Sequence, residues 1–488
     1  MHLPNHTYLQ VTEPIHCNDT HSKLNPTDVS EIIVPQNESD VVEAIIRAKN
    51  EGKQISICGS RHSMGGQQFG KGTFLLDMRS LDSVGSLDLQ SGIVKVGAGI
   101  CWPALIEALL ARQKGNKSVW TIRQKQTGAD RLTLGGALAS NIHGRGLHMK
   151  PFIDDVESFR LIDSKGITHC CSREQNSKLF SLAIGGYGCF GVVTQVSLRL
   201  SLRTQLERIV EVTTLDLLPS AVSERISKGC LYGDFQFSID ETSEDFLWKG
   251  VLSSYRPVGE DSAIPETNES LGVLRWEKLV HMAHFDRQNV FSTYSDYYLS
   301  THGNRYWSDT HQLGVYVDGY HEKLDRECQA SEMITELYVP HEALISFMKN
   351  AASLLRESGL PVIYGTMRLI RKDSESYLPW AKQDFACVIF NLHLEHTDAG
   401  IALAQQTFRA LIVLALEHSG SYFLTYHRWA EKAQVEAAYP NFQDFLKEKI
   451  AYDPSQQFQS EWWRHYQKMF GIPEPETEER NLTANERQ

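Results

Sequence analysis

This sequence has no excess of basic residues and no long apolar run, and we expect no leader segment. Its 488 residues include 48 Lys and Arg against 60 Asp and Glu, which gives a formal net charge of −12. Nucleic acids and anionic membranes are bound through clustered Lys and Arg, so we expect neither as a partner. Residues 1–24 contain no basic segment followed by an apolar run, and no stretch of 18 or more apolar residues occurs. We therefore expect a soluble, cytoplasmic protein.

Cysteine is scarce and unpatterned. Nine cysteines are scattered without a CxxC pair, and the adjacent Cys170 and Cys171 cannot easily bridge each other. Reduced, mostly buried thiols are the interpretation that fits. The 19 histidines include pairs such as His393 and His396 that suggest a metal site. No H-E-x-x-H or comparable ligand cluster occurs, so we predict neither a bound metal nor a metallohydrolase.

The patterning of apolar residues predicts an α+β fold in at least two domains, since the chain is too long for one core. Short strands and turns dominate up to residue 202. Beyond it, aromatic residues and histidines become frequent, and two long helical patterns alternate with strands, which indicates a second sheet covered on one face. The expected strands are 55–58, 74–78, 92–96, 156–162, 192–200, 362–370 and 386–393, and the expected helices are 38–51, 103–111, 177–184, 341–357 and 398–418.

One glycine motif matches a dinucleotide-binding fingerprint and is rejected. Residues 186–191 read G-x-G-x-x-G, which needs a strand before it and a helix after it. Here a helix precedes the motif and an alternating strand follows it. The glycines still let the backbone approach a planar ligand closely.

Two glycine-rich loops are the stronger signal. The first, residues 58–66, follows a strand directly, and successive backbone N–H groups in such a turn can form a concave anion site. The second, residues 133–146, is dominated by small residues, with hydroxyls and an amide where a buried polar ligand needs partners. Taken alone, either loop is as well explained as a structural turn.

In this order, the two loops resemble the FAD domain of the vanillyl-alcohol oxidase / p-cresol methylhydroxylase (PCMH) family. The resemblance runs through ISICGSRHSMGG, TLGGALASNIHGRG, VESFRLIDSKG and GGYGCFGVVTQVSLRL, and FLTYHRWA and YDPSQQF support it near the C-terminus. It is nearest to the sugar-oxidising branch, which holds aldonolactone, alditol and decaprenylphosphoryl-ribose oxidases. The resemblance implies a PCMH-type two-subdomain FAD-binding domain over 25–202 and a substrate domain with an antiparallel sheet covered by helices over 203–424. Residues 425–470 would return to the FAD domain, and residues 1–24 and 471–488 would be an extension and a polar tail.

The resemblance also implies which residues hold FAD. Residues 59–65 would wrap the pyrophosphate, a second group would line the other side of the cofactor, and Val193 would lie at the adenine end. The first group is Gly59, Ser60, Arg61, His62, Ser63, Met64 and Gly65, and the second is Gly128, Leu132, Thr133, Gly136, Ser140, Ile142 and His143.

His62 is expected to carry a covalent link to the flavin. Many members of the family bond a histidine at this position to the benzenoid methyl group, although the decaprenylphosphoryl-ribose enzymes have no histidine there. Bicovalent members add a cysteine before the second loop, and residues 124–134 contain none. The resemblance therefore implies one link at most.

Five residues outside the FAD loops are candidate catalytic residues: Arg368, Tyr426, His427, Asn391 and His393. The family places an arginine at the Arg368 position near the substrate and the reduced flavin, where a fixed positive charge stabilises negative charge. Tyr426 replaces a lysine of many sugar oxidases, a departure that leaves the base and substrate class open. Asn391 and His393 alternate on one strand face, and a buried structural role fits them equally well.

The resemblance implies oxidation of a CH–OH group on a sugar, alditol or aldonolactone by hydride transfer to flavin N5, with oxygen or another acceptor reoxidising the flavin. Side chains such as Tyr306, Tyr316 and His321 suit a polar substrate cavity. The alternatives are amine oxidation of the cytokinin dehydrogenase kind, whose loop is also similar, and a non-catalytic flavin-binding protein.

Overall fold

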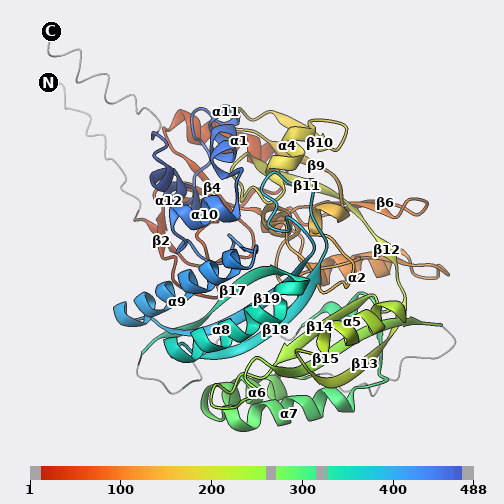
Figure 1. The fold of residues 1–488 in the computed structure, drawn as a ribbon. Coiled ribbons are helices and arrows are strands. Elements are labelled where there is room, and N and C mark those ends of the chain that lie inside the picture. Colours follow the sequence, from red (N-terminus) through yellow and green to blue (C-terminus); the bar gives the residue numbers. More distant parts are fainter. Residues whose placement is uncertain (1–12, 260–270, 315–323, 325–327, 475–488) are drawn as a thin grey trace, which may run out of the picture.

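The computed structural model describes residues 13–259, 271–314, 324 and 328–474, and its architecture is α+β as predicted. In Figure 1 the red-to-yellow elements and the dark blue C-terminal helices form one half of the molecule, and the green and cyan elements form the other. Every strand and helix predicted above is present, with small differences at the ends.

The N-terminal half contains two main sheets. Strands β3, β5 and β4 form a parallel sheet, and β10, β9, β11, β7 and β6 form an antiparallel one. Their bounds are β3 Glu31–Ile33, β4 Ile55–Cys58, β5 Phe74–Asp77, β6 Val84–Asp88, β7 Ile93–Gly97, β9 Val156–Ile162, β10 Thr168–Ser172 and β11 Val192–Arg199. The short pairs are β1 Ile15–Cys17 with β2 Thr27–Val29, and β8 Trp120–Thr121 with β12 Ser201–Leu202. The helices are α1 Glu38–Asn50, α2 Trp102–Arg112, α3 Leu134–Ser140 and α4 Ser177–Ala183.

The C-terminal segment lies against this half. Its helices are α10 Lys432–Ala438, α11 Phe442–Tyr452 and α12 Glu461–Phe470. Phe458 bridges Ile55 of β4 in parallel, and the Trp462 N–H donates to the Gly66 carbonyl at 3.2 Å. Residues at both ends of the chain therefore build the surroundings of the first glycine-rich loop.

The second half is one antiparallel sheet of eight strands in the order β16-β13-β15-β14-β18-β19-β17-β20. The strands are β13 Gln205–Thr214, β14 Tyr232–Phe237, β15 Lys249–Val258, β16 Arg305–Trp307, β17 Ala330–Pro340, β18 Val362–Ile370, β19 Phe385–Glu395 and β20 Ser421–Tyr422. The helices are α5 Leu218–Ser227, α6 Val273–Phe285, α7 Arg287–Ser300, α8 Leu344–Ser358 and α9 Asp398–Glu417. Alternation along the strands gives the sheet one apolar face, as with Phe235 and Phe237, and one polar face, as with Asp234 and Gln236.

Helices lie on both faces of this sheet, whereas the sequence predicts cover on one face only. Met333 of β17 faces α9, because it lines a cavity with Gln405 and Arg409. On the opposite face, Trp276 of α6 packs edge-on against Tyr364 of β18, with ring centroids 6.2 Å apart. The helix pair α6 and α7 therefore covers part of the polar face. Neither of these two helices is among those predicted from the sequence.

Helix α9 is long and apolar enough to cross a membrane by length and composition alone, although polar residues such as Gln405 and Arg409 interrupt its apolar runs. Within its most apolar window 39% of the residues are buried. Its buried residues include Phe408, Leu411 and Ile412, which belong to the main apolar core. The core helix of a globular protein passes the same test, so this feature is weak evidence for a membrane.

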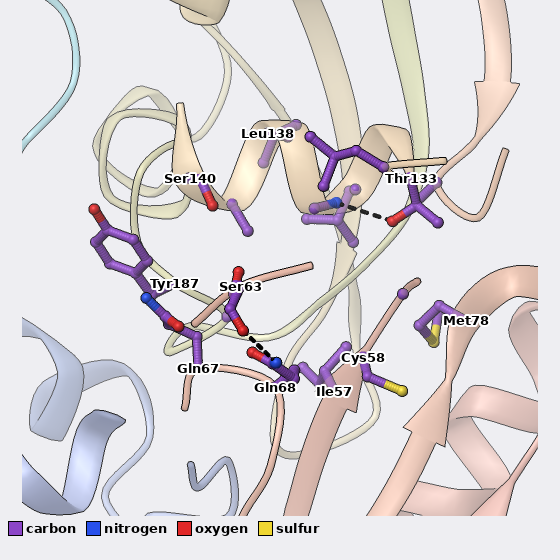
Figure 2. A pocket seen from close by; sticks show the side chains of 18 of the residues that line it. Ile57, Cys58, Ser63, Gln67, Gln68, Met78, Thr133, Leu138, Ser140 and Tyr187 are labelled. Atoms are coloured by element: carbon purple, nitrogen blue, oxygen red, sulfur yellow. Dashed lines mark hydrogen bonds between the residues drawn. The ribbon is translucent and has the colours of Figure 1, made fainter. Parts of the chain in front are cut away.

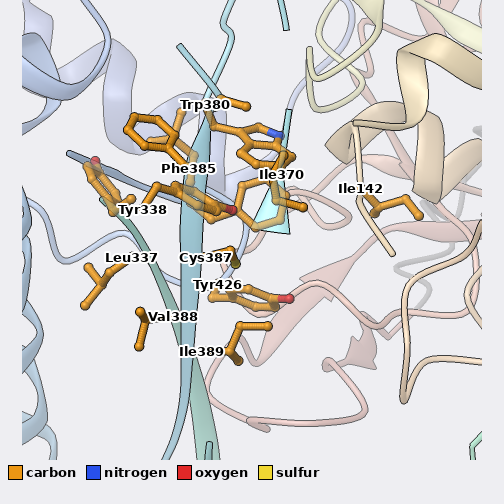
Figure 3. Close-up of a cluster of buried hydrophobic side chains, with 14 of the residues drawn as sticks. Ile142, Leu337, Tyr338, Ile370, Trp380, Phe385, Cys387, Val388, Ile389 and Tyr426 are labelled. Atoms are coloured by element: carbon orange, nitrogen blue, oxygen red, sulfur yellow. The ribbon is translucent and has the colours of Figure 1, made fainter. Parts of the chain in front are cut away.

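Buried polar contacts join the two halves. His143 Nε2 lies 3.0 Å from Glu336 Oε2, and Asn141 Nδ2 donates to Asp373 Oδ2 at 2.9 Å. The indole N–H of Trp380 donates to the Asn141 carbonyl at 3.0 Å. Figure 3 shows Ile142 of the first half facing Trp380 and Ile370 of the second. The polar face of the large sheet is thereby held against the end of the second glycine-rich loop.

Candidate functional site

The two glycine-rich loops touch each other at Gly59 and Thr133. Strand β4 ends at Cys58, and a Cβ atom on Gly59 would stand 2.1 Å from Thr133 Oγ1. Thr133 is the N-cap of α3, and its hydroxyl accepts a hydrogen bond from the Gly136 N–H at 3.3 Å. Arg61 has a φ of +60°, which turns the first loop back on itself.

A cavity lies between these loops. Figure 2 shows Leu138 and Ser140 on one side of it, with Ile57 and Gln68 on the other. Ten of the predicted FAD residues line the cavity: Gly59, Ser60, Arg61, His62, Ser63, Leu132, Thr133, Gly136, Ser140 and Val193. Five predicted residues are not in its lining: Met64, Gly65, Gly128, Ile142 and His143.

The residues 186–191 also line this cavity, from Tyr187 to Gly191. They connect α4 to β11, so a helix precedes the motif and a strand follows it, as predicted. Gly191 has a φ of +150°, and a Cβ atom there would stand 2.5 Å from the Ile162 carbonyl oxygen. The motif contributes backbone to the cavity wall without forming a Rossmann turn.

Several buried polar atoms in the cavity wall lack a hydrogen-bond partner among the described residues. Arg61 Nε and the Oε1 atoms of Gln67 and Gln68 are buried, and none has a hydrogen-bond partner among the described residues. Gln68 Nε2 donates to the Ser63 carbonyl at 2.6 Å, and Gln67 Nε2 donates to the Thr425 carbonyl at 2.8 Å. Since buried polar groups are normally satisfied, these donors and acceptors fit a ligand with both polar functions.

His62 reaches the cavity from the first loop. Its Nδ1 lies 2.7 Å from Nε2 of His21, and the two ring centroids are 4.8 Å apart. Burial, together with the neighbouring His21 and Arg131, lowers the pKa of His62 to about 3. The imidazole is therefore neutral and nucleophilic at physiological pH. His21 is a neighbour that the sequence motif does not contain.

A second polar cluster lies where the sheet meets the first half. Tyr426 donates a hydrogen bond to Glu336 Oε1 at 2.9 Å and accepts one from Gln126 Nε2 at 2.6 Å. Glu336 Oε2 accepts a further bond from Tyr338 at 2.8 Å and lies 3.0 Å from His143 Nε2. Figure 3 shows Tyr426 beside β19 near Cys387 and Ile389.

Electrostatics keep this cluster in defined protonation states. Burial raises the pKa of Tyr426 well above its usual value, and the neighbouring Glu336 raises it further. Burial alone would raise the pKa of Glu336, but His143, Arg368 and the bond from Tyr338 together hold it below its usual value. At neutral pH the cluster therefore contains a protonated phenol that donates to a charged carboxylate.

Arg368 lies on β18 opposite Cys387 of β19, so it shares the polar face. Arg368 is 7% exposed, and its side chain makes no hydrogen bond or ion pair with any described residue. The nearest charged groups include Glu336 and Lys125. Burying a guanidinium that makes no hydrogen bond or ion pair is costly, even with Glu336 nearby, and it indicates a position where an anion or a polarised oxygen binds.

The other predicted catalytic residues are dispersed. Asn391 is paired with Tyr364 across the strands and shares the polar face with Arg368. His393 lies farther along β19, next to Glu332 and His284. His427 stacks between Tyr422 and Trp429 and lines a different cavity together with Met64. The structure therefore brings Tyr426, Arg368 and Asn391 to one face but does not bring His427 to it.

The predicted cavity residues beyond β13 are only partly described. Tyr306 packs beneath Arg208, whose guanidinium lies 4.7 Å from the ring centroid. Tyr316 and His321 lie outside the described residues.

Sequence patterns missed several groups at this site, namely Glu336, Gln126, Arg145 and Asp234. Arg145 is buried, contacts Asp234 at 3.3 Å and lies over the ring of Tyr255. Arg145 lies within the second loop, next to Gly146, and the alternation of β17 places Glu336 on its polar face. The loop motif and the strand alternation could have marked Arg145 and Glu336 as candidates. Their side-chain contacts depend on how the two halves pack together.

Comparison with known proteins identifies the domain that contains the two glycine-rich loops. Residues 29–172 match the FAD binding domain family. An uncharacterized oxidoreductase, ORF5 in the fasciation locus of Rhodococcoides fascians, is 33% identical over 170 residues, which cover 35% of this chain and 37% of that protein. Decaprenylphosphoryl-β-D-ribose oxidase of Mycolicibacterium smegmatis is 27% identical over 36% of this chain and 37% of its own length. Cytokinin dehydrogenase 9 of Oryza sativa subsp. japonica is 27% identical over 40% of this chain and 35% of its own length.

Residues 29–172 are therefore an FAD-binding domain, and the predicted family resemblance is confirmed for this part of the chain. The matches cover little more than a third of the length of these relatives. The cavity fits the cofactor, because the close approach of the loops and the unsatisfied polar atoms lie within the matched domain. The residues 59–63 and 132–140 would hold it.

We expect Gly59→Ala to reduce the fraction of chains that carry FAD. The added Cβ would overlap Thr133 Oγ1, so one loop must move, and overpacking of this kind weakens a site by roughly five- to a hundredfold. The ratio of flavin to protein absorbance after purification measures the effect. Gly272→Ala is the control, because no atom of the described residues lies within 4 Å of that Cβ position and φ is −64°. Equal flavin content in both variants would contradict the role of this contact.

Proposed function

We propose that the protein is an FAD-dependent oxidoreductase that oxidises a CH–OH group of a polyhydroxylated small molecule of the sugar, alditol or aldonolactone type. The observation that carries this proposal is a set of unsatisfied polar atoms on one face of the large sheet. Arg368 Nε, Thr366 Oγ1, Gln236 Oε1 and Ser253 Oγ are buried without partners among the described residues. Strand pairing aligns Gln236 with Thr366, so these two lie side by side. A substrate with several hydroxyl groups would satisfy such a mixture of donors and acceptors.

The residues around this face support the chemistry. Bound FAD would supply the hydride acceptor. Arg368 would stabilise the negative charge that develops as the substrate is oxidised. Tyr426 would take the hydroxyl proton at its Oη atom while passing its own proton to Glu336 Oε1 along the existing 2.9 Å hydrogen bond. Gln126 would hold the phenol in place through its 2.6 Å bond.

A covalent bond between His62 and the flavin is part of this proposal. The neutral imidazole, its place in the cavity wall and its contact with His21 support it. A nucleophile must present a lone pair, and the depressed pKa of His62 provides one over the whole physiological range.

His62→Ala is expected to abolish covalent attachment, so that acid precipitation releases all the flavin from the variant. Denatured wild-type protein should instead keep a flavin fluorescence band on a gel. Mass spectrometry of the flavin-labelled peptide distinguishes His62 from its neighbour His21. Release of FAD from acid-treated wild-type protein would overturn the covalent proposal while leaving the oxidoreductase proposal intact.

An amine oxidation is the second candidate, and one feature favours it. A second cavity lies beside the polar face, between α6, α7 and strands β14 and β18. Most of its lining is apolar, including Trp276, Leu279 and Phe291. A relative named as a cytokinin dehydrogenase is among the similar proteins. Anaerobic mixing of the purified protein with polyols or amines, followed by flavin bleaching, decides between the two.

The electron acceptor is tested with the same preparation. Flavin reduced by substrate is mixed with air-saturated buffer or with an artificial acceptor such as a quinone. Rapid reoxidation by oxygen would support an oxidase, and reoxidation by the acceptor alone would support a dehydrogenase. A colourless purified protein would contradict any flavin-dependent function.

A further inference from the structure

One group of metal-ligating side chains among the described residues outside the FAD cavity consists of His284, Glu332 and His393. One ligand atom from each lies within 4.8 Å of the other two. His284 Nε2 is 3.0 Å and His393 Nδ1 is 3.3 Å from the same oxygen, Glu332 Oε1. The imidazole rings meet nearly at right angles, with centroids 4.9 Å apart.

We propose that these three residues, the His284 site, bind a divalent first-row transition ion of the Zn²⁺ type. Two imidazoles and one carboxylate are a ligand set that such ions take in proteins. In a tetrahedral zinc site with metal–ligand bonds near 2.0–2.1 Å, neighbouring ligand atoms stand about 3.3 Å apart. The two approaches to Glu332 Oε1 match that spacing. Three protein ligands leave a position open for water or another ligand.

The ligands come from three separate elements. His284 is near the end of α6, Glu332 is near the start of β17, and His393 lies opposite Glu332 on β19. The side chains of His284 and His393 are almost fully buried, and that of Glu332 is 16% exposed. A metal would therefore connect helix α6 to the adjacent strands β17 and β19 and stabilise the cover over the polar face.

The His284 site is separate from the polar cluster around Tyr426 and Glu336. His393 lies six positions after Cys387 on β19, which corresponds to about 20 Å along the strand. The group His143, Glu336 and Cys387 also has metal-ligating side chains close together. There, Glu336 already accepts hydrogen bonds from Tyr338 and Tyr426, so its oxygens are occupied. The second group therefore fits a hydrogen-bond network better than a metal.

Metal content of the FAD-loaded protein tests the proposal. After loading with Zn²⁺ and desalting, elemental analysis should find about one zinc per chain in the wild type. Loss of an outer-shell partner already weakens metal sites by 10–100-fold, so removing a ligand in Glu332→Gln or His393→Ala should lower affinity by at least about 100-fold. Zinc should remain bound in Cys387→Ala, which removes the thiol of the other group. It should also remain in His169→Ala, which removes a histidine paired with Asp163 at 2.8 Å.

Cobalt substitution tests the proposal on the wild-type protein alone, so the result does not depend on the folding of a variant. Co²⁺ held only by nitrogen and oxygen should give ligand-field bands without a thiolate-to-metal charge-transfer band. A thiolate band, zinc loss in Cys387→Ala, absence of tight zinc in the wild type, or full zinc retention in Glu332→Gln would each overturn the proposal. None of these readouts depends on flavin reduction, so the proposal can fail while the proposed oxidoreductase activity stands.

Discussion

Arg368→Met is expected to lower the rate of substrate oxidation by about two to three orders of magnitude, as is typical for the loss of one preorganised donor. The guanidinium is buried, lies on the face that carries Asn391, and makes no hydrogen bond or ion pair with the described residues. Removal of the charge therefore breaks no hydrogen bond or ion pair with a described residue, and the protein should stay folded and yellow. The rate of flavin bleaching under anaerobic stopped-flow conditions measures the effect.

Two further variants isolate the role of the charge. Arg368→Lys keeps a positive charge but loses the planar fork, so it should recover part of the rate. Arg371→Met is the matched control, because Arg371 follows the same strand and pairs with Asp384 at a largely exposed position. Its rate should stay within a factor of about two, as for most surface ion pairs. Near-normal oxidation by Arg368→Met would return Arg368 to a structural role.

Substrate selectivity is the prediction with the largest expected effect. A site built to hydrogen-bond a hydroxyl rejects an analogue that lacks it by about four orders of magnitude, because its own polar groups are left unsatisfied. Thr366, Gln236 and Ser253 present such groups on the face beside Arg368. We therefore expect sugars, alditols or aldonolactones to bleach the flavin, and their deoxy analogues and simple aliphatic alcohols to do so only very slowly.

The panel includes aromatic and isoprenoid amines as the contrasting class. If an amine reduces the flavin and no polyol does, the sugar interpretation is wrong, and the apolar cavity next to Tyr364 becomes the substrate site. Tyr426 also bears on anionic substrates. A neutral phenol cannot replace a lysine ammonium beside a phosphate or carboxylate. Substrates that carry those anions should then depend on Arg368 instead.

Local pattern located the two glycine-rich loops, and the family resemblance gave them a role in holding a cofactor. Gly59 directly follows a strand, and Thr133 and Ser140 belong to a short capped helix. Such elements are specified by short-range preferences: glycine where the backbone must turn or approach, and a hydroxyl where a helix begins. The α+β class and the rejection of the Rossmann motif rest on the same local order of helix and strand.

Long-range contacts were beyond the reach of these patterns. Tyr426 meets Gln126 and Glu336 from positions 300 and 90 residues away, and neither partner shares a motif with it. His427 is adjacent to Tyr426 in sequence but stacks between other rings, because neighbouring residues in an irregular segment point in different directions. The histidine pair noted from the sequence, His393 and His396, is not the one that the fold assembles.

What the sequence determined by itself is therefore the FAD-binding domain, the order of its loops, the α+β class and the strand that carries Arg368. Only the tertiary structure decided that Arg368 is buried without a hydrogen-bond partner for its Nε among the described residues, and that His284 reaches Glu332 and His393 across three elements. The physical reason is that local preferences act over a few residues, whereas burial and the pairing of polar groups arise only when distant segments pack. The polar face of the large sheet acquires its chemistry from that packing.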